Sequence, residues 1–245
     1  MRPTTPELEA HLAAEHRMGK VQEFLKEIVY GGNDGIVTTF AIVAGFAGAG
    51  AEGAAAVGGV AVLLFGFANL FADATAMGLG AFLAVRSEQD VYRAARTKEM
   101  REIRENLELE RRESLDILGA MGLDRADAEA MTDIMARNPE FMADFMMQYE
   151  LGLSDPTEDD AATKGLATFL AFILFGAAPI LPYVFLPPGD AAFQASLVLS
   201  VTALVALGLL RWRVTAETMA RCVGETLLVG GLCGAVAYGV GLLFA

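Results

Sequence analysis

Long uncharged stretches constrain the fold of this chain more than any other feature. Residues 57–85 contain a single charged side chain, Asp73, and residues 191–210 contain none. A helix needs about 20 mostly apolar residues to cross the hydrocarbon core of a bilayer. With 54% hydrophobic residues and a mean hydropathy of +0.44, the composition favours an all-α membrane protein over a soluble domain.

Five segments are predicted as membrane helices: residues 28–50, 57–85, 163–186, 191–210 and 223–244. Basic residues flank these segments unevenly. Arg17, Lys20 and Lys26 precede the first segment, and Arg211, Arg213 and Arg221 lie between the last two, whereas the connections GAGAEGAAA and PPGD have no basic residue. Because basic loops tend to stay in the cytosol, the N-terminal region, residues 87–160 and residues 211–221 are predicted to be cytosolic.

The chain is accordingly divided into four regions. We expect an amphipathic cytosolic helix in residues 1–27, the first two spans in 28–86, a cytosolic helical domain in 87–160, and the last three spans in 161–245. The first region lacks the apolar core of a signal peptide, so none is expected. The 87–160 region reads as about three helices, with a break near Asn106, a cap at Asp124 and a helix start at Pro139.

The charge balance limits the partners. The chain has 31 acidic and 18 basic residues, a net charge of −13. Phosphate binding needs clustered Lys and Arg, so a nucleic-acid partner is excluded, whereas cations suit an acidic surface. Cys222 and Cys233 lie three helical turns apart and are expected to be separate buried side chains without a disulfide.

Acidic side chains in residues 87–160 recur at helical spacing. Two pairs are three residues apart, and two methionines precede a further acid by three and four residues: Glu99 and Glu102, Glu110 and Glu113, and Met146 and Met147 before Glu150. Like charges on one helix face cost stability, and a divalent cation would offset that cost. Because this region has no His or Cys, structural zinc is disfavoured. Carboxylates with a thioether suit ferrous iron, with manganese as the other candidate.

A second interpretation of the same region stays open. Basic residues alternate with the acids along residues 96–112, as in a solvated, salt-bridged helix. In that interpretation Met146 and Met147 belong to an apolar core and bind no metal.

Asp34 lies in the motif GGNDGIVTTF, near the start of the first predicted span. An ionised carboxylate in a membrane helix is costly, so it usually faces a cavity and has a function. The structural alternative is a cap at the start of that helix. The glycines on both sides would allow a close backbone approach or an opened helix end.

Taken together, these motifs resemble the vacuolar iron transporter family. The resemblance is carried by GGNDGIVTTFAIVAGFAGA, FANLFADATAMGLGAFLAVRSEQD, the Glu-rich helices, FMMQYELGL and APILPY, in the family's order from His16 to the end of the chain. It implies five membrane spans, a homodimer, and a cytosolic helical metal-binding domain between spans two and three. It also implies transport of Fe²⁺ and related divalent ions out of the cytosol, coupled to protons in plant members.

The resemblance also assigns residues. It implies a cytosolic metal site of Glu99, Glu102, Glu110, Glu113, Met146, Met147 and Glu150, and a transport pathway containing Asp34 and Met77. Plant members have a glutamate where this chain has Asn69. Asp73 lies one turn later on the same face, so either Asp73 supplies the missing charge or the pathway works with one acid fewer. We expect Asn69, Asp73 and Met77 to line the pathway with Asp34. Asp34 is expected to bind the metal and to take up a proton on its release.

The sequence therefore predicts a non-enzymatic exporter of Fe²⁺, or Mn²⁺, by proton antiport, for metal homeostasis and detoxification. The metal is its substrate, and no prosthetic group is expected.

The alternative is a membrane-anchored metal sensor or store without transport. A ferritin-like oxidase is disfavoured because such sites use Glu-x-x-His pairs. The short chain and Asn69 favour a bacterial-type member in the plasma (inner) membrane; a eukaryotic member would occupy a vacuole-type membrane.

Overall fold

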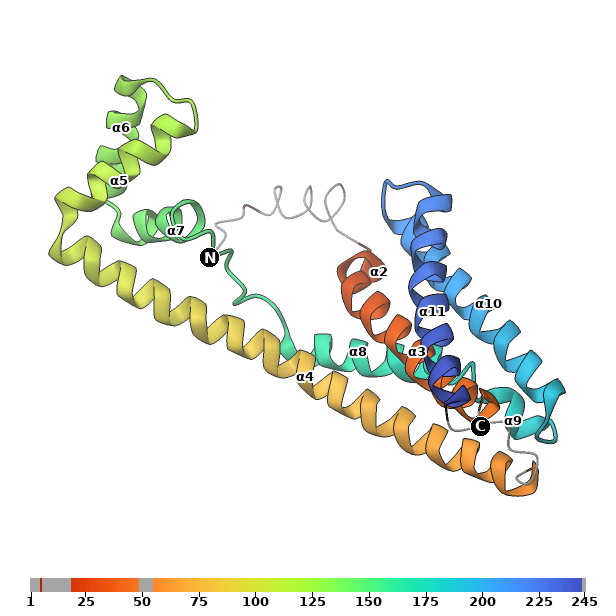
Figure 1. Ribbon diagram of the computed structural model, residues 1–245. Helices are drawn as coiled ribbons and strands as arrows, with labels where there is room; N and C mark the ends of the chain where they lie inside the picture. Colours follow the sequence, from red (N-terminus) through yellow and green to blue (C-terminus); the bar gives the residue numbers. More distant parts are fainter. Residues whose placement is uncertain (1–4, 6–18, 49–54, 244–245) are drawn as a thin grey trace. The chain divides into compact units, whose positions relative to one another are not determined.

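The computed structural model describes Thr5, residues 19–48 and residues 55–243, and every regular element in these residues is a helix (Figure 1). The helices are α2 (Lys20–Glu23), α3 (Leu25–Gly48), α4 (Ala55–Glu105), α5 (Leu107–Ala120), α6 (Arg125–Ala136), α7 (Pro139–Tyr149), α8 (Ala161–Gly176), α9 (Leu181–Phe185), α10 (Asp190–Val214) and α11 (Met219–Leu242). They form two compact units. The first contains the chain up to Ala81 and from Ala162 onward, and the second is Phe82–Ala161. Helix α4 contributes to both.

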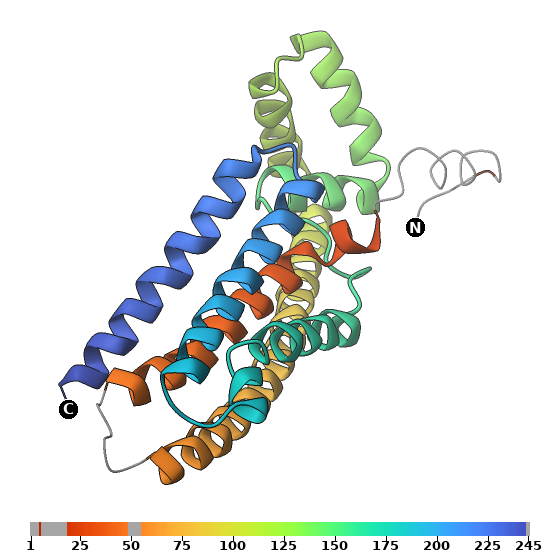
Figure 2. The same cartoon turned by 90° about the vertical axis from the view of Figure 1, so that its right-hand side faces the viewer.

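Small residues bring the helices of the first unit together. Helices α3, α10 and α11 lie side by side (Figures 1 and 2). Helix α8 approaches α3 through glycines: a Cβ on Gly31 would lie 2.6 Å from the carbonyl oxygen of Thr168, and one on Gly35 would lie 2.5 Å from that of Phe172. Such contacts are typical of membrane helices, whose backbones approach closely at small residues. They place α8 against α3 on the turns that flank Asp34.

Three of the described helices are long and apolar enough to cross a membrane: Val60–Glu105, Asp190–Val214 and Met219–Leu242. On the first of these, Leu64, Leu79 and Leu83 are between 60 and 64% exposed, an arrangement that suits lipid better than water. Helix α3 also has membrane-spanning length, but it contains Asn33 and Asp34. Helix α8 is apolar and shorter than a full span.

The third predicted span, residues 163–186, is interrupted. Helix α8 ends at Gly176, and α9 begins at Leu181 with Pro182 in its first turn. A proline inside a helix removes a hydrogen bond and clashes with the preceding turn, which explains a break at Pro179 and Pro182. The hydroxyl of Ser196 on α10 donates to the Pro179 carbonyl at 2.7 Å and ties the break to its neighbour.

Most of the predicted N-terminal helix lies outside the described residues, namely residues 1–4 and 6–18. Residues 49–54, at and after the end of the first predicted span, and residues 244–245, at the end of the last, also lie outside them. The described part of residues 1–27 contains α2 and the start of α3 at Leu25.

In the second unit, local signals set the helix ends. Helix α4 continues without interruption to Glu105, and Asn106 separates it from α5. The predicted cap is confirmed, because an Asp124 carboxylate oxygen accepts the backbone N–H of Asp127 at 2.9 Å. Pro139 begins α7, as predicted. The core is rich in methionine, an adaptable side chain that fills irregular space; it contains Met100, Ile103, Leu118, Met135, Met142, Phe145 and Met146.

The contact between α3 and α8 yields the first prediction. Gly35→Ala should destabilise the protein by about 1–3 kcal/mol, because the added methyl group meets the backbone of Phe172. Gly45→Ala, on the same helix, is the matched control, since no heavy atom lies within 4 Å of the added group. Thermal unfolding in detergent measures both. Equal melting temperatures for the two variants would contradict this packing.

Candidate metal centre

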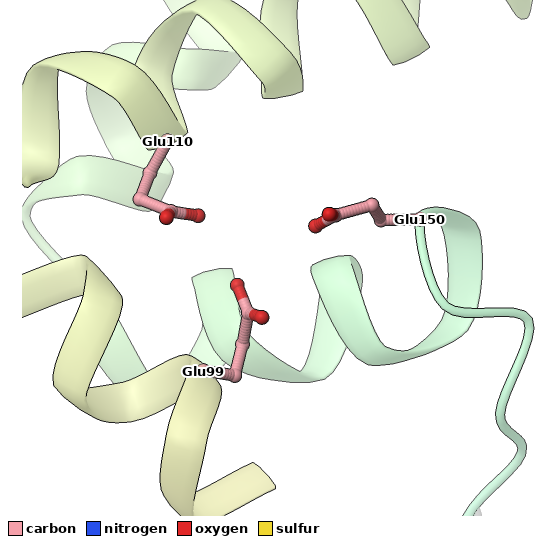
Figure 3. A group of neighbouring side chains, drawn as sticks. All are labelled: Glu99, Glu110 and Glu150. Carbon is pink, nitrogen blue, oxygen red and sulfur yellow. The ribbon is translucent and has the colours of Figure 1, made fainter. Parts of the chain in front are cut away.

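Three glutamates from three helices converge in the second unit. Glu99 comes from α4, Glu110 from α5 and Glu150 from the end of α7, and one carboxylate oxygen from each lies within 4.8 Å of the others (Figure 3). The three side chains point toward a common centre. This is an arrangement in which one cation can contact all three residues.

The helix ends determine this geometry. The break at Asn106 lets α5 turn relative to the end of α4, so that Glu110 meets Glu99. Glu150 is the residue that ends α7. The backbone that follows Glu150 is held by hydrogen bonds from Leu151 N to Met146 O, at 3.1 Å, and from Leu153 N to Met147 O, at 2.8 Å. Gly152 has φ +65°, a left-handed conformation that commonly ends helices.

The cluster is electrostatically unfavourable without a cation. Glu99 and Glu110 are each only 4% exposed, and each has one carboxylate oxygen, Glu99 Oε1 and Glu110 Oε2, without a hydrogen-bond partner in the described chain. Burial, reinforced by the charge of Glu110, raises the pKa of Glu99 to about 8. Burial also raises the pKa of Glu110 and that of Glu150. Buried acceptors without donors and carboxylates with raised pKa values are the features that a bound divalent cation would relieve.

The other two predicted glutamates stand beside this cluster and are not among the three that converge. Glu102 pairs with Lys98 at 3.4 Å. The negative charge of Glu102 raises the pKa values of Glu99, Glu110 and Glu150, and that of Glu113 raises those of Glu110 and Glu150. Both residues therefore increase the negative potential at the centre.

The two predicted methionines are fully buried. Met146 belongs to the methionine-rich core, and its sulfur accepts a hydrogen bond from Ser114 Oγ at 3.5 Å. Ser114 was not predicted, although it lies one turn after Glu110 on the same face of α5. Met147 is also 0% exposed.

The basic residues of this unit mostly pair elsewhere, which bears on the salt-bridge interpretation. Arg96 binds Glu140 at 2.7 Å and Asp144 at 3.0 Å, and Arg111 binds Asp133. Among the ion pairs within the described residues, none involves Glu99, Glu110 or Glu150. The salt-bridge pattern thus accounts for much of the domain surface and includes none of these three glutamates. The charge of Lys98 offsets only part of the rise in the pKa of Glu150.

The predicted pathway residues all belong to the first unit and are half-buried. Asp34 lies inside α3, which begins at Leu25, so its alternative role as a cap of that helix is wrong. Asn69 donates to an Asp73 carboxylate oxygen at 2.5 Å, and Asp73 is close enough to Asp34 for their charges to interact. Met77 instead packs against the apolar cluster around Leu70 and Phe172.

A cavity of about 740 Å³ lies between α3, α4 and α11, with Asn69 on its wall and a mostly apolar lining.

The structure adds one acid, Glu27, that was not predicted from the sequence as a site residue. It is 9% exposed, and its Oε2 has no hydrogen-bond partner among the described residues. It precedes Asp34 by seven positions, which places both on one face of α3; that spacing was the available signal.

Comparisons with known proteins agree with these features. A family model described as the VIT family matches residues 25–242. Vacuolar iron transporter 2 of Oryza sativa subsp. japonica is 34% identical over 218 residues, which cover 89% of this chain and 86% of the relative. Vacuolar iron transporter 1 of Arabidopsis thaliana is 33% identical over 216 residues, covering 88% and 84%. The vacuolar iron transporter of Toxoplasma gondii is 34% identical over 238 residues, covering 94% and 77%.

The raised pKa of Glu99 predicts how stability depends on pH. Between pH 4.5 and about 8, the folded protein retains a proton that the unfolded chain has released. The metal-free protein should therefore lose stability as the pH rises through this window. Glu99→Gln should flatten that dependence and raise the melting temperature by several degrees near pH 8 (on the order of 1 kcal/mol or more of stability).

Thermal unfolding in the presence of a chelator, from about pH 5 to about pH 8, measures this effect. Glu108→Gln is the control, because Glu108 is exposed on the same unit. If the wild type and Glu99→Gln show the same dependence on pH, the electrostatic description of the cluster is incorrect.

Proposed function

The chain belongs to the VIT family, and on this premise we propose that it exports divalent metal ions, Fe²⁺ and also Mn²⁺, from the cytosol in exchange for protons. Members of this family are transporters and not enzymes. The apolar helices and the family together make the chain an integral membrane protein that transports metal ions.

The choice of a metal-ion substrate rests on one observation. Carboxylate oxygens of Glu99, Glu110 and Glu150 lie within 4.8 Å of one another, and two buried oxygens among these residues have no hydrogen-bond partner in the described chain. A donor set of carboxylates suits hard and borderline divalent cations, and a nearby thioether would shift the preference toward Fe²⁺. In this proposal the cluster captures metal on the cytosolic side. Glu102 and Glu113 add negative potential, and Met146 and Met147 supply the softer donors.

Asp34 is the central residue of the proposed pathway. Its carboxylate lies inside α3, in reach of the charge of Asp73, which also accepts a hydrogen bond from Asn69. Metal can bind to carboxylates only when they are deprotonated, so metal binding releases protons and metal release permits protonation. This exchange supports proton antiport. Asp73, one turn from Asn69, supplies the charge that Asn69 lacks, and Met77 contributes a thioether farther along the same helix.

We also propose a membrane topology and a homodimeric assembly. Five spans, built from α3, the first part of α4, α8 with α9, α10 and α11, would place residues 87–160 in the cytosol. The working unit would be a homodimer in the plasma membrane of a bacterium or a vacuole-type membrane of a eukaryote. This topology rests on the distribution of basic residues around the predicted spans.

A membrane-anchored metal sensor or store is the second candidate, because the three-glutamate cluster by itself would serve such a protein. Asp34 and Asp73 favour transport, since an anchor has no need for costly acids within its membrane helices.

The test is metal uptake by liposomes that contain the purified protein. Asp34→Asn should lower the rate of Fe²⁺ uptake at least about tenfold and abolish the accompanying proton exit, while Mn²⁺ binding by the second unit is retained. Asp190→Asn, in the exposed first turn of α10, is the control and should transport like the wild type. Undiminished uptake by Asp34→Asn would rule out its assigned role.

A further inference from the structure

The segment that leaves Glu150 is held by hydrogen bonds more than by a buried core. We call residues 151–160, between α7 and α8, the strap. None of these ten residues is buried. A cavity of about 510 Å³ lies between the strap and α4, lined in part by Val91, Tyr92, Leu153 and Pro156. Because side chains leave this space open, polar contacts contribute to the position of the strap.

Gln89 on α4 provides such a contact. It is 6% exposed, which is uncommon for a glutamine. Its side-chain Nε2 donates to the carbonyl oxygen of Pro156 at 3.1 Å and to that of Asp159 at 2.9 Å. An amide nitrogen has two hydrogens, so both donors are used on the strap. No sequence motif marks this contact, because the partners are 67 and 70 residues from Gln89.

Hydrogen bonds hold the strap near both of its ends. At the far end, Asp159 N donates to Pro156 O at 3.1 Å, and Asp155 Oδ1 accepts Thr157 N at 2.9 Å. At the near end, Leu151 and Leu153 are bound to the last turn of α7. Because both ends of the strap are held, releasing its contact with Gln89 would leave the residues that follow Glu150 with fewer restraints.

Glu150 depends on such support more than the other two carboxylates do. Glu99 and Glu110 lie within α4 and α5 and are buried, whereas Glu150 is exposed and ends its helix. A side chain at a helix end is free to move as the last turn frays. Metal affinity falls when a ligand has to be ordered at the moment of binding.

We propose that Gln89 is a positioning residue for the metal centre: by anchoring the strap to α4, it holds Glu150 within reach of Glu99 and Glu110. The inference rests on the proposed function, in which these three glutamates bind the transported ion. Gln89 touches no ion itself. One helix, α4, then supplies a ligand at Glu99 and fixes a second ligand through Gln89.

The test is a double-mutant cycle on the full-length protein in detergent, with Mn²⁺ as the probe and its free concentration measured by electron paramagnetic resonance. Gln89→Leu should weaken Mn²⁺ binding roughly five- to tenfold. In a Glu150→Gln background, which itself binds more weakly, Gln89→Leu should cause no further loss, because the ligand that it positions has been removed. Gln148→Leu is the matched control: the same exchange at an exposed position two residues before Glu150, expected to bind like the wild type.

Thermal unfolding of each variant checks that it folds. Gln89→Glu provides a second test of binding, because it keeps the side-chain shape and removes both hydrogen-bond donors. It should lose at least as much affinity as Gln89→Leu. An equal loss in both backgrounds would mean a general structural role and would overturn the inference, as would wild-type affinity in both Gln89 variants. Wild-type affinity in Glu150→Gln alone would instead reject the ligand set of the proposed function, and the inference with it.

Discussion

The convergence of Glu99, Glu110 and Glu150 is the constraint around which the second unit is organised. Three carboxylates within 4.8 Å, two of them 4% exposed, repel one another and lose hydration. The nearby arginines bind other acids, and the charge of Lys98 offsets this cost only in part, at Glu150. A fold retains such a cluster when it serves a ligand, since charge and desolvation are otherwise relieved by mutation. A divalent cation is the ligand that this donor set fits.

The rest of the structure brings these carboxylates together and links them to the membrane. Helix α4 runs from an apolar segment with exposed leucines to the helical turn that carries Glu99. The strap leads from Glu150 into α8. Helix α8 in turn lies against Gly31 and Gly35 of α3, on the turns that flank Asp34. The metal centre and the proposed pathway are thus joined by two continuous stretches of chain. Helix α4 carries residues of both, and the strap with α8 connects Glu150 to the helix that packs against α3.

Features with a local cause were predictable from the sequence, and features set by long-range packing were not. Asp124 caps α6 and Pro139 starts α7 because capping depends on a few adjacent residues. Helical spacing identified the acidic faces of α4 and α5. Which acids meet across helices depends on how those helices pack, and the packing brings Glu99 to Glu110 and Glu150. The pair of Glu102 with Lys98 is local, since the two residues are four apart on α4. The Gln89 contact, 67 residues away in sequence, had no local signal.

The most direct measurement is a titration of the metal-free, full-length protein with Mn²⁺, compared with a variant in which Glu99, Glu110 and Glu150 are all replaced by glutamine. Glutamine preserves the shape and removes the charge, so the methionine-rich core should stay intact. A metal centre at these glutamates should give a saturable site in the wild type that the triple variant lacks, together with a rise in the wild-type melting temperature as Mn²⁺ is added. Identical saturable binding by both proteins, or no saturable binding by the wild type, would contradict it.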